Sequence, residues 1–329
     1  MSMLLRVEGL VTRFYTDEGV VKAVDGSSFH LGINEALGVV GESGSGKTVT
    51  ALSIMRLIEN PGRIESGRIL FNGEDLLRKS EREMRRIRGK DISMVFQDSL
   101  SSLNPTLTVG AQIARVLKYH THLSRRARWR RAVELLAAVG IPEPAKRASH
   151  YPHQLSGGMR QRALIAMAIS CDPKLLILDE PTTALDVTIE AQIFELIGDL
   201  KARLGMGVFL ITHDLSVVAS FCQRVIIMYA GKIVEEADIH ELYANPLHPY
   251  TRGLLRSIPP LEGEAERLES IPGEVPDLIN LPPGCNFGPR CDLADERCRE
   301  VEPELAEVSP GHRVACLKVG APVTGGGNG

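Results

Sequence analysis

The chain has 329 residues, 43% hydrophobic and 24% charged, a composition typical of a soluble globular protein. This length suits a large domain plus a smaller one. The formal net charge of −3 argues neither for nor against a nucleic-acid partner. No apolar run is long enough to cross a bilayer, and the first residues lack the order of a signal peptide. We therefore expect a cytoplasmic protein.

Short apolar strands alternate with helical stretches over residues 1–240. Strands are expected near 4–8 and 26–33, in 35–40, 174–179 and 207–212, and as a pair within 225–237 that turns at Ala230–Gly231. Helices are expected at 109–118, 124–139, 159–170 and 187–204. This order predicts an α/β fold with a mostly parallel sheet, and the two early strands could form an antiparallel edge.

The composition changes after about residue 257. The stretch "SIPPLEGEAERLESIPGEVPDLINLPPGC" is rich in Pro, Gly and Glu, and prolines interrupt both helices and sheet ladders. We expect a main domain over residues 1–257 and a small irregular extension over 258–329 that ends in a disordered tail.

A phosphate-binding loop is indicated by "GESGSGKT", which fits G-x-x-x-x-G-K-[ST] and follows an expected strand. Its glycines let backbone N–H groups point at phosphate oxygens, and the next helix adds the positive end of its dipole. Lys47 can reach the β- and γ-phosphates, and the Thr48 hydroxyl can bind Mg²⁺. The expected ATP-contacting residues are Gly41, Ser43, Gly44, Ser45, Gly46, Lys47 and Thr48.

The apolar strand in "LLILDE", residues 175–180, delivers two acidic residues at its carboxyl end. Ligands of open α/β sheets bind at that end of the strands. Asp179 can hold the Mg²⁺ shell, and Glu180 can activate a water molecule for attack on the γ-phosphate. Alone the pattern is weak, but together with the phosphate-binding loop it predicts ATP hydrolysis.

A second anion cradle is expected where "QLSGGMRQRALIAMAIS" starts a helix. Ser156 is a good N-cap, and Gly157 and Gly158 leave the first N–H groups of the helix uncovered. One nucleotide has one γ-phosphate, which Lys47 already reaches. The sequence therefore permits a head-to-tail dimer in which this cradle closes on the ATP of the partner.

These motifs, in this order, resemble the ATPase subunits of ATP-binding-cassette (ABC) transporters over residues 1 to about 240. The resemblance rests on "GESGSGKT", "MVFQD", "LSGGMRQR", "LLILDEPTTALD" and "LITHD". It implies an ABC-type ATPase with a RecA-like core, an antiparallel β edge and a helical subdomain. It also implies a dimer in which Ser156–Gly158 close over the other subunit's ATP.

The same resemblance implies roles for four further residues. Asp186 would lie at the dimer seam, His213 would contact the γ-phosphate, and Gln97 would join the catalytic and Mg²⁺ site and link it to the membrane partner. Phe14 would stack on adenine, with Tyr15 as the alternative. Where the family commonly has Gln this chain has Met159, which leaves the Ser-Gly-Gly cradle intact.

Two longer stretches, "FQDSLSSLNPTLTVGAQI" and "NPLHPYTRGLL", resemble a narrower group, the ATPase subunits of bacterial dipeptide and oligopeptide importers. That group usually has Pro where this chain has Ser99. The resemblance implies peptide import, with nickel or glutathione import as alternatives. It also implies two permease subunits, an extracytoplasmic binding protein, a second and distinct ATPase subunit, no nucleic acid, and a peripheral position on the cytoplasmic face of the bacterial inner membrane.

Cassette ATPases of other classes fit less well. Chromosome and repair ATPases insert a long coiled coil between the two motifs, whereas Lys47 and Ser156 are 109 residues apart (156 − 47) without a sustained heptad repeat. Soluble translation-factor ATPases usually carry two cassettes in one chain, and this sequence shows one.

Four of the six cysteines lie in the extension, with the spacing C-x₅-C-x₆-C-x₁₇-C. Reduced thiols in a segment with little core are natural metal ligands, and four thiolates suit either Zn²⁺ or a [4Fe–4S] cluster. The spacing leaves these two open. The resemblance to peptide importers implies the [4Fe–4S] cluster, with ligands Cys285, Cys291, Cys298 and Cys316.

Overall fold

The computed structural model describes residues 3–97, 102–183, 185–257 and 271–319. The chain divides into two compact units. The first unit comprises Met1–Leu5, Leu31–Ala36 and Phe71–Ile211, and the second comprises Arg6–His30, Leu37–Leu70 and Thr212–Gly329. The predicted disordered tail, "TGGGNG", lies outside the described residues, and the domain boundary at residue 257 stays a prediction.

The sheet of the first unit is parallel, as the sequence predicts. Its strands are β6 (Ile92–Val95), β7 (Leu175–Asp179) and β8 (Gly207–Thr212), with β7 between the other two. Every residue of β7 and β8 is buried. A strand covered on both faces must be apolar throughout, which explains why "LLIL" shows no alternation.

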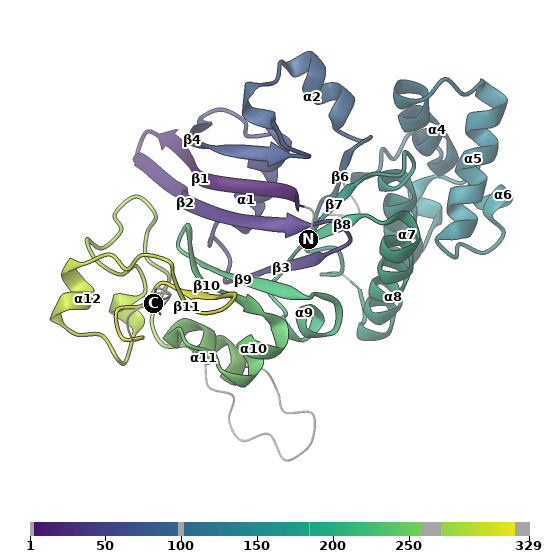
Figure 1. Ribbon diagram of the computed structural model, residues 1–329. Helices are drawn as coiled ribbons and strands as arrows, with labels where there is room; N and C mark the ends of the chain where they lie inside the picture. Colours follow the sequence, from purple (N-terminus) through teal and green to yellow (C-terminus); the bar gives the residue numbers. More distant parts are fainter. Residues whose placement is uncertain (1–2, 98–101, 184, 258–270, 320–329) are drawn as a thin grey trace, which may run out of the picture. The chain divides into compact units, whose positions relative to one another are not determined.

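Six α-helices belong to the described part of the first unit, and α4, α5 and α6 lie side by side in Figure 1. Along α4, Val109, Ile113 and Leu117 recur every four residues and form the buried stripe of the helix. The predicted helices begin and end within two residues of those observed. The bounds are α2 (Glu81–Ile87), α4 (Val109–His120), α5 (Arg125–Ala138), α6 (Pro144–Arg147), α7 (Gly157–Ala168) and α8 (Val187–Leu204), with a short strand β5 (Glu74–Asp75) and two 3₁₀ turns, η1 (Leu76–Arg78) and η2 (Pro152–Gln154).

A second sheet contains the early strands, which are longer than predicted. They are β1 (Met3–Thr16) and β2 (Gly19–Gly32), with β4 (Gly62–Phe71) beside β1 (Figure 1). Only two residues join β1 to β2, and such a short connection requires antiparallel strands. The predicted antiparallel edge is therefore present.

The second unit also contains β3 (Ala36–Val40), which pairs in parallel with β9 (Arg224–Tyr229). The next strand, β10 (Lys232–Asp238), returns antiparallel to β9 after the predicted Ala230–Gly231 turn. Both turn residues have positive φ. The helices of this unit are α1 (Lys47–Met55), α9 (Leu215–Phe221), α10 (Ile239–Ala244), α11 (Pro249–Arg256) and α12 (Glu296–Glu300), and η3 (Gly288–Arg290) is a 3₁₀ turn.

The C-terminal extension is less irregular than predicted, because it continues this sheet. Its strands β11 (Ala306–Ser309) and β12 (His312–Val314) are antiparallel to each other, and β12 pairs antiparallel with β10. The expectation of an irregular segment arose from its prolines, whereas both short strands lie beyond most of them. Pairing with β10 supplies the hydrogen bonds that so short a hairpin could not provide alone.

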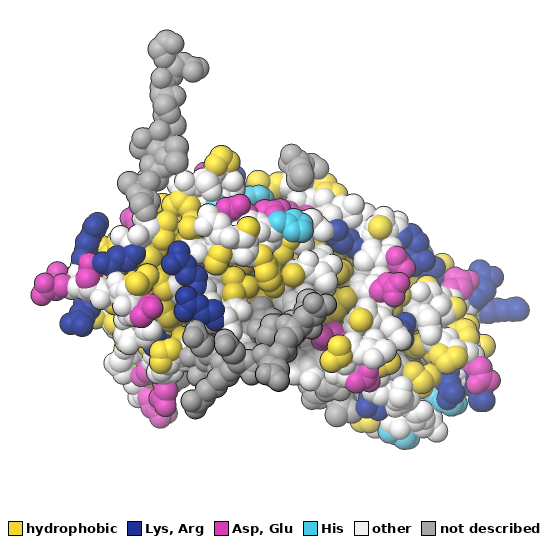
Figure 2. Space-filling model, turned by 90° about the horizontal axis from the view of Figure 1, so that it is seen from below, with side chains coloured by type: hydrophobic (Ala, Val, Ile, Leu, Met, Phe, Trp, Pro, Cys, Tyr) yellow, Lys and Arg dark blue, Asp and Glu magenta, His cyan; other side chains and the backbone are white. Residues whose placement is uncertain are grey.

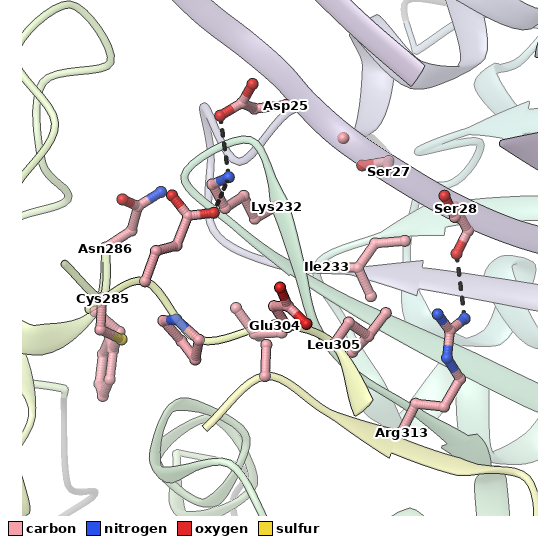
Figure 3. Close-up of a pocket in the computed structure, with 16 residues that line it drawn as sticks. Asp25, Ser27, Ser28, Lys232, Ile233, Cys285, Asn286, Glu304, Leu305 and Arg313 are labelled. Carbon is pink, nitrogen blue, oxygen red and sulfur yellow. Dashed lines mark hydrogen bonds and ion pairs between the residues drawn. The ribbon is translucent and has the colours of Figure 1, made fainter. Parts of the chain in front are cut away.

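Charged side chains fasten the extension to β10 and β2, and Figure 3 shows several of them around a cavity of about 310 Å³. Lys232 of β10 binds Asp25 at 3.0 Å and Glu302 at 2.5 Å. Arg313 of β12 donates to the Ser28 carbonyl at 3.3 Å and to the buried Glu236 carboxylate at 2.8 Å. The extension is thus attached to the rest of the second unit through strand pairing and ion pairs.

The surface agrees with the near-neutral net charge. On the described part of the face in Figure 2, Lys and Arg side chains are interspersed with Asp and Glu, so this face lacks the basic stripe typical of nucleic-acid binders. Among the described residues, none of the helices combines the length and hydrophobicity needed to span a membrane.

Candidate active site

The phosphate-binding loop lies in the second unit, between β3 and α1. Gly46 is the residue before α1 and has a φ of 101°, which a side chain would strain. Lys47, 6% exposed, folds back over the loop, and its ammonium donates to the carbonyls of Gly41 at 2.7 Å and Glu42 at 2.8 Å. A cation is therefore held inside a curl of backbone at the start of a helix.

Two glycines let this loop pack directly against neighbouring backbone. A Cβ atom at Gly41 would lie 2.1 Å from the Met228 carbonyl oxygen, and one at Gly46 would lie 2.3 Å from the Ala23 carbonyl oxygen. The loop is thus fixed in a curl that only glycine permits. Together with Lys47 and the Thr48 hydroxyl in the first turn of α1, this cradle fits the phosphates of Mg-ATP, and Thr48 would help to hold the Mg²⁺.

Glu42 has a set of partners that the sequence analysis missed. Its backbone N–H donates to the Tyr250 hydroxyl at 2.9 Å, and its carboxylate binds the Arg290 guanidinium at 2.6 and 3.1 Å. Burial raises the pKa of the Tyr250 hydroxyl, so this group stays neutral. Tyr250 belongs to the stretch quoted for the peptide-importer resemblance, but no motif signals that it or Arg290 contacts the loop.

The predicted adenine platform, Phe14, lies on β1 and is half-buried. Its ring covers Gly62, where a Cβ atom would lie 2.5 Å from Cε1 of Phe14. The alternative, Tyr15, is engaged elsewhere: its hydroxyl donates to Glu65, and the Arg63 guanidinium lies 4.0 Å from its ring centroid. These contacts favour Phe14, whose stacking on adenine remains a prediction.

His213 also belongs to the second unit. It follows the last residue of β8 and is exposed to solvent. The next residue, Asp214, caps α9 by accepting from the Ser216 N–H at 2.7 Å, so the strand end and the helix start fix the backbone on both sides of His213. Its predicted contact with the γ-phosphate remains a prediction.

The first unit brings the predicted acidic pair and Gln97 together. Asp179 ends β7 and is 2% exposed. Glu180 follows with a φ of 44°, unusual for a residue other than glycine, and its N–H donates to the Ile211 carbonyl at 2.9 Å. Gln97 donates to the Glu180 carboxylate at 2.9 Å, and Thr183 donates to it at 3.1 Å. These two donors orient the carboxylate.

Ser156 is the N-cap of α7, as predicted, and its hydroxyl accepts from the Met159 N–H at 3.3 Å. Gly157 and Gly158 form the first turn of the helix. Among contacts outside the helix, a Cβ atom at Gly157 would lie 3.5 Å from the Leu185 side chain, and one at Gly158 would lie 3.0 Å from the Ile189 side chain. Asp186 caps α8 by accepting from the Ile189 N–H at 2.9 Å. The roles of these four residues in a dimer remain predictions.

The prediction of a [4Fe–4S] cluster is wrong, and so is its Zn²⁺ alternative. Within the described ranges, which contain all four cysteines, no group of three or more His, Cys, Asp or Glu side chains is arranged to hold a metal ion. The thiols are free, and burial raises the pKa of Cys285 and Cys291, so both stay protonated. The extension obtains its stability instead from strand pairing with β10, buried ion pairs and the packing of Phe287 among aromatic rings. The four predicted ligands were Cys285, Cys291, Cys298 and Cys316.

Two family models match the chain. The model described as "ABC transporter" matches residues 24–183, and the model described as "Oligopeptide/dipeptide transporter, C-terminal region" matches residues 234–298. The second match covers most of β10, all of α11 and much of the extension, including the segment that supplies Arg290.

Curated relatives resemble the chain over almost its whole length. A probable peptide ABC transporter ATP-binding protein of Sinorhizobium fredii is 53% identical over 96% of this chain and 95% of its own. An oligopeptide transport ATP-binding protein of Bacillus subtilis is 49% identical over 96% and 97%, and a dipeptide transport ATP-binding protein of Escherichia coli is 50% identical over 95% and 96%.

Solved structures of ATP-binding cassettes have the same fold. A dimeric cassette in a post-hydrolysis state, bound to ADP and Pi, superposes with a TM-score of 0.65 at 27% identity, over 72% of this chain and 99% of that one. The fold class, the motif order and the full-length relatives agree. The chain belongs to the ATP-binding subunits of peptide ABC transporters and is an ATPase of that family.

Proposed function

We propose that the chain hydrolyses Mg-ATP to drive the import of dipeptides and oligopeptides through a membrane permease. The observation that carries the proposal is the glycine-lined curl around Lys47, which fits a polyphosphate. The relatives named for peptide, oligopeptide and dipeptide transport support the choice of cargo. The cargo itself need not touch this chain.

In this proposal each motif residue has a task. Lys47 and the loop N–H groups bind the phosphates, while Thr48, Asp179 and Gln97 hold Mg²⁺, which supplies charge neutralisation when bound. Glu180 accepts the proton of the attacking water, and Gln97 and Thr183 orient its carboxylate for that transfer. His213 contacts the γ-phosphate, and Phe14 stacks on the adenine ring.

We further propose that two ATPase subunits act together. Ser156, Gly157 and Gly158 would present the N–H groups of α7 to the ATP of the other subunit, and Asp186 would lie at the seam. A partner that is related but distinct fits the resemblance to importers with two ATPase chains. The cassette bound to ADP and Pi, which shares the fold, is dimeric, and this supports the proposal that two ATPase subunits act together.

ATP binding and release would drive alternating access in two permease subunits, to which a separate binding protein delivers the cargo. The chain would lie on the cytoplasmic face of the inner membrane. The docking surface would be formed by the segment after Gln97, "SLSSLNPTLTVG". Residues 99–101 of that segment lie outside the described residues, and α4 begins at Val109 within it.

To test which cargo is transported, the ligand of the binding protein that is encoded with this chain should be identified. We expect dipeptides and oligopeptides to bind it, as measured by calorimetry on the purified binding protein. Binding of a nickel chelate or of glutathione instead would refute peptide import but leave the ATPase assignment intact, because the ATP site does not contact the cargo.

A further inference from the structure

Arg290 lies in the C-terminal extension, yet its guanidinium contacts the phosphate-binding loop. Its two terminal nitrogens donate to the two carboxylate oxygens of Glu42, at 2.6 and 3.1 Å. The two residues are 248 positions apart in sequence and belong to the same unit. A pair of parallel charge-assisted hydrogen bonds fixes both the distance and the orientation of the two groups. The extension therefore holds the second residue of the loop rigidly.

The environment of Arg290 is built for this contact. The Arg290 side chain is 4% exposed, and its remaining N–H groups donate to the carbonyls of Pro272 at 2.9 Å and Ile271 at 3.3 Å and to the Tyr229 hydroxyl at 3.4 Å. A buried guanidinium whose donors are all directed in this way has little freedom to turn. Removing Glu42 would leave a buried cation with two donors unsatisfied, which is costly.

Glu42 in turn determines where Lys47 lies. The Glu42 carbonyl accepts from the Lys47 ammonium at 2.8 Å and from the Ser45 N–H at 3.2 Å, while its own N–H is held by Tyr250. A rotation of the Glu42 peptide would therefore move the lysine that reaches the phosphates. The position of the Glu42 side chain, set by Arg290, is thus linked to the phosphate-binding group.

A second connection reaches the loop from the same part of the extension. Asn286 donates to the Ala230 carbonyl at 3.1 Å, in the turn between β9 and β10. The next residue, Gly231, donates its N–H to the Ser45 carbonyl at 3.0 Å. The segment from Asn286 to Arg290 thus contacts the loop directly at Glu42 and, through one turn, at Ser45.

An aromatic cluster fixes this segment in place. The Phe287 ring lies 5.2 Å from the Tyr229 ring and 5.4 Å from the Tyr250 ring, measured between centroids, and all three residues are buried. Tyr250 is also the residue that accepts from the Glu42 N–H. Tyr250 therefore both packs against Phe287 of the extension and accepts a hydrogen bond from the loop.

We propose that Arg290 is a positioning residue for ATP binding, and that the extension acts through it as a brace on the phosphate-binding loop. The inference rests on the proposed function, since it assumes that the loop binds ATP. Loss of the brace should loosen the loop in the free enzyme and weaken the capture of ATP. It should change the maximal turnover less, because Glu180 and its partners lie on other elements.

The test compares Arg290→Ala, Arg290→Lys and Glu42→Gln in the full chain, assembled with its partner subunits. We expect the KM for ATP of Arg290→Ala to rise about tenfold, a typical size for coupling between two sites, with kcat within about twofold. Arg290→Lys keeps the charge but cannot form two parallel bonds, so it should restore part of the affinity. Glu42→Gln tests the same contact from the loop and does not depend on the folding of an extension variant.

Arg313→Ala is the matched control. Arg313 is another arginine of the extension that binds a buried carboxylate, but its partners are Ser28 and Glu236, which lie outside the loop. It should lower the melting temperature without changing the KM. The double variant Glu42→Gln with Arg290→Ala should raise the KM no further than Arg290→Ala alone, since both remove one contact.

Either of two results would refute the positioning role of Arg290. One is an equal effect of Arg313→Ala and Arg290→Ala on the KM for ATP. The other is a KM in the double variant that reflects the sum of the two single effects. A wild-type protein that neither binds nor hydrolyses ATP would instead refute the proposed function, so the two failures can be told apart.

Discussion

Gln97 donates a hydrogen bond to the carboxylate of Glu180 across 2.9 Å, although the two residues are 83 positions apart in sequence. They follow β6 and β7, which are neighbouring parallel strands, and such strands end at the same edge of a sheet. Thr183 donates to the same carboxylate oxygen. Two neutral donors from separate segments of the chain thus orient the Glu180 carboxylate.

Replacing Glu180 with Gln should abolish turnover while ATP still binds. Glutamine keeps the shape of the side chain but cannot accept a proton, so release of inorganic phosphate should fall by about 10²-fold or more. Phosphate release and equilibrium ATP binding are the two measurements. Glu195→Gln, an exposed acidic residue of α8, is the control and should behave as wild type. Wild-type turnover in Glu180→Gln would remove this residue from its catalytic role.

Replacing Gly41 with Ala should prevent nucleotide binding. The added Cβ atom would lie 2.1 Å from the Met228 carbonyl oxygen, so the loop must shift away from the backbone of β9. We expect ATP affinity to fall by at least about tenfold, because the N–H groups that bind phosphate move with the loop. Gly205→Ala, at a glycine with positive φ but with open space around it, should cost stability alone. Unchanged ATP binding in Gly41→Ala would contradict this account of the loop.

Acid should destabilise the second unit through His248. Burial lowers the pKa of this imidazole to about 4, whereas in the unfolded chain its pKa is about 6.5. The unfolded state therefore binds a proton first, and stability is lost as the pH falls from 6.5 towards 4, by about 3 kcal/mol in total. Denaturant unfolding at pH 7 and pH 5 measures the loss. His248→Asn can still cap α11, where His248 accepts from the Tyr250 N–H, and should show a smaller loss. An equal loss in both proteins would exclude His248 as the cause.

His312 should produce the opposite pH dependence. A hydrogen bond to the buried Glu235 carboxylate at 2.8 Å raises the pKa of His312, and Glu241, 3.5 Å away on the other side of the ring, acts in the same direction. The stability that this pair contributes is fully present below pH 6.5 and is lost as the pH rises through the raised pKa. The destabilisation caused by His312→Gln should therefore be larger at pH 6 than at pH 9. A pH-independent difference between the two unfolding curves would show that His312 packs as a neutral ring.

The sequence predicted the parts of the fold that depend on local pattern. Continuous apolar runs such as that in β7 indicated buried parallel strands, and Ser156 indicated the start of α7. The motifs likewise indicated Lys47 and Glu180, because their chemistry depends on short spacings that a sequence displays directly.

The contacts made by the C-terminal extension were not predictable in this way. Glu42 and Arg290 meet beside the packed rings of Tyr229, Tyr250 and Phe287, and a tertiary contact between distant residues has no spacing to recognise. The four clustered cysteines suggested a metal site, and the resemblance to peptide importers led to the wrong prediction of a [4Fe–4S] cluster. The cysteine spacing could not correct it. It displays four thiols but not their arrangement, nor the strand β12, which pairs with β10.

The central claim is that ATP hydrolysis by this chain drives peptide uptake. The most direct measurement reconstitutes the chain with its partner ATPase, permease and binding protein in liposomes, and follows phosphate release and uptake of a labelled dipeptide together. We expect peptide-loaded binding protein to stimulate both, and Glu180→Gln to abolish both while the protein still binds ATP. Peptide uptake that continues in Glu180→Gln, or ATP hydrolysis without any uptake when peptide is present, would contradict this claim.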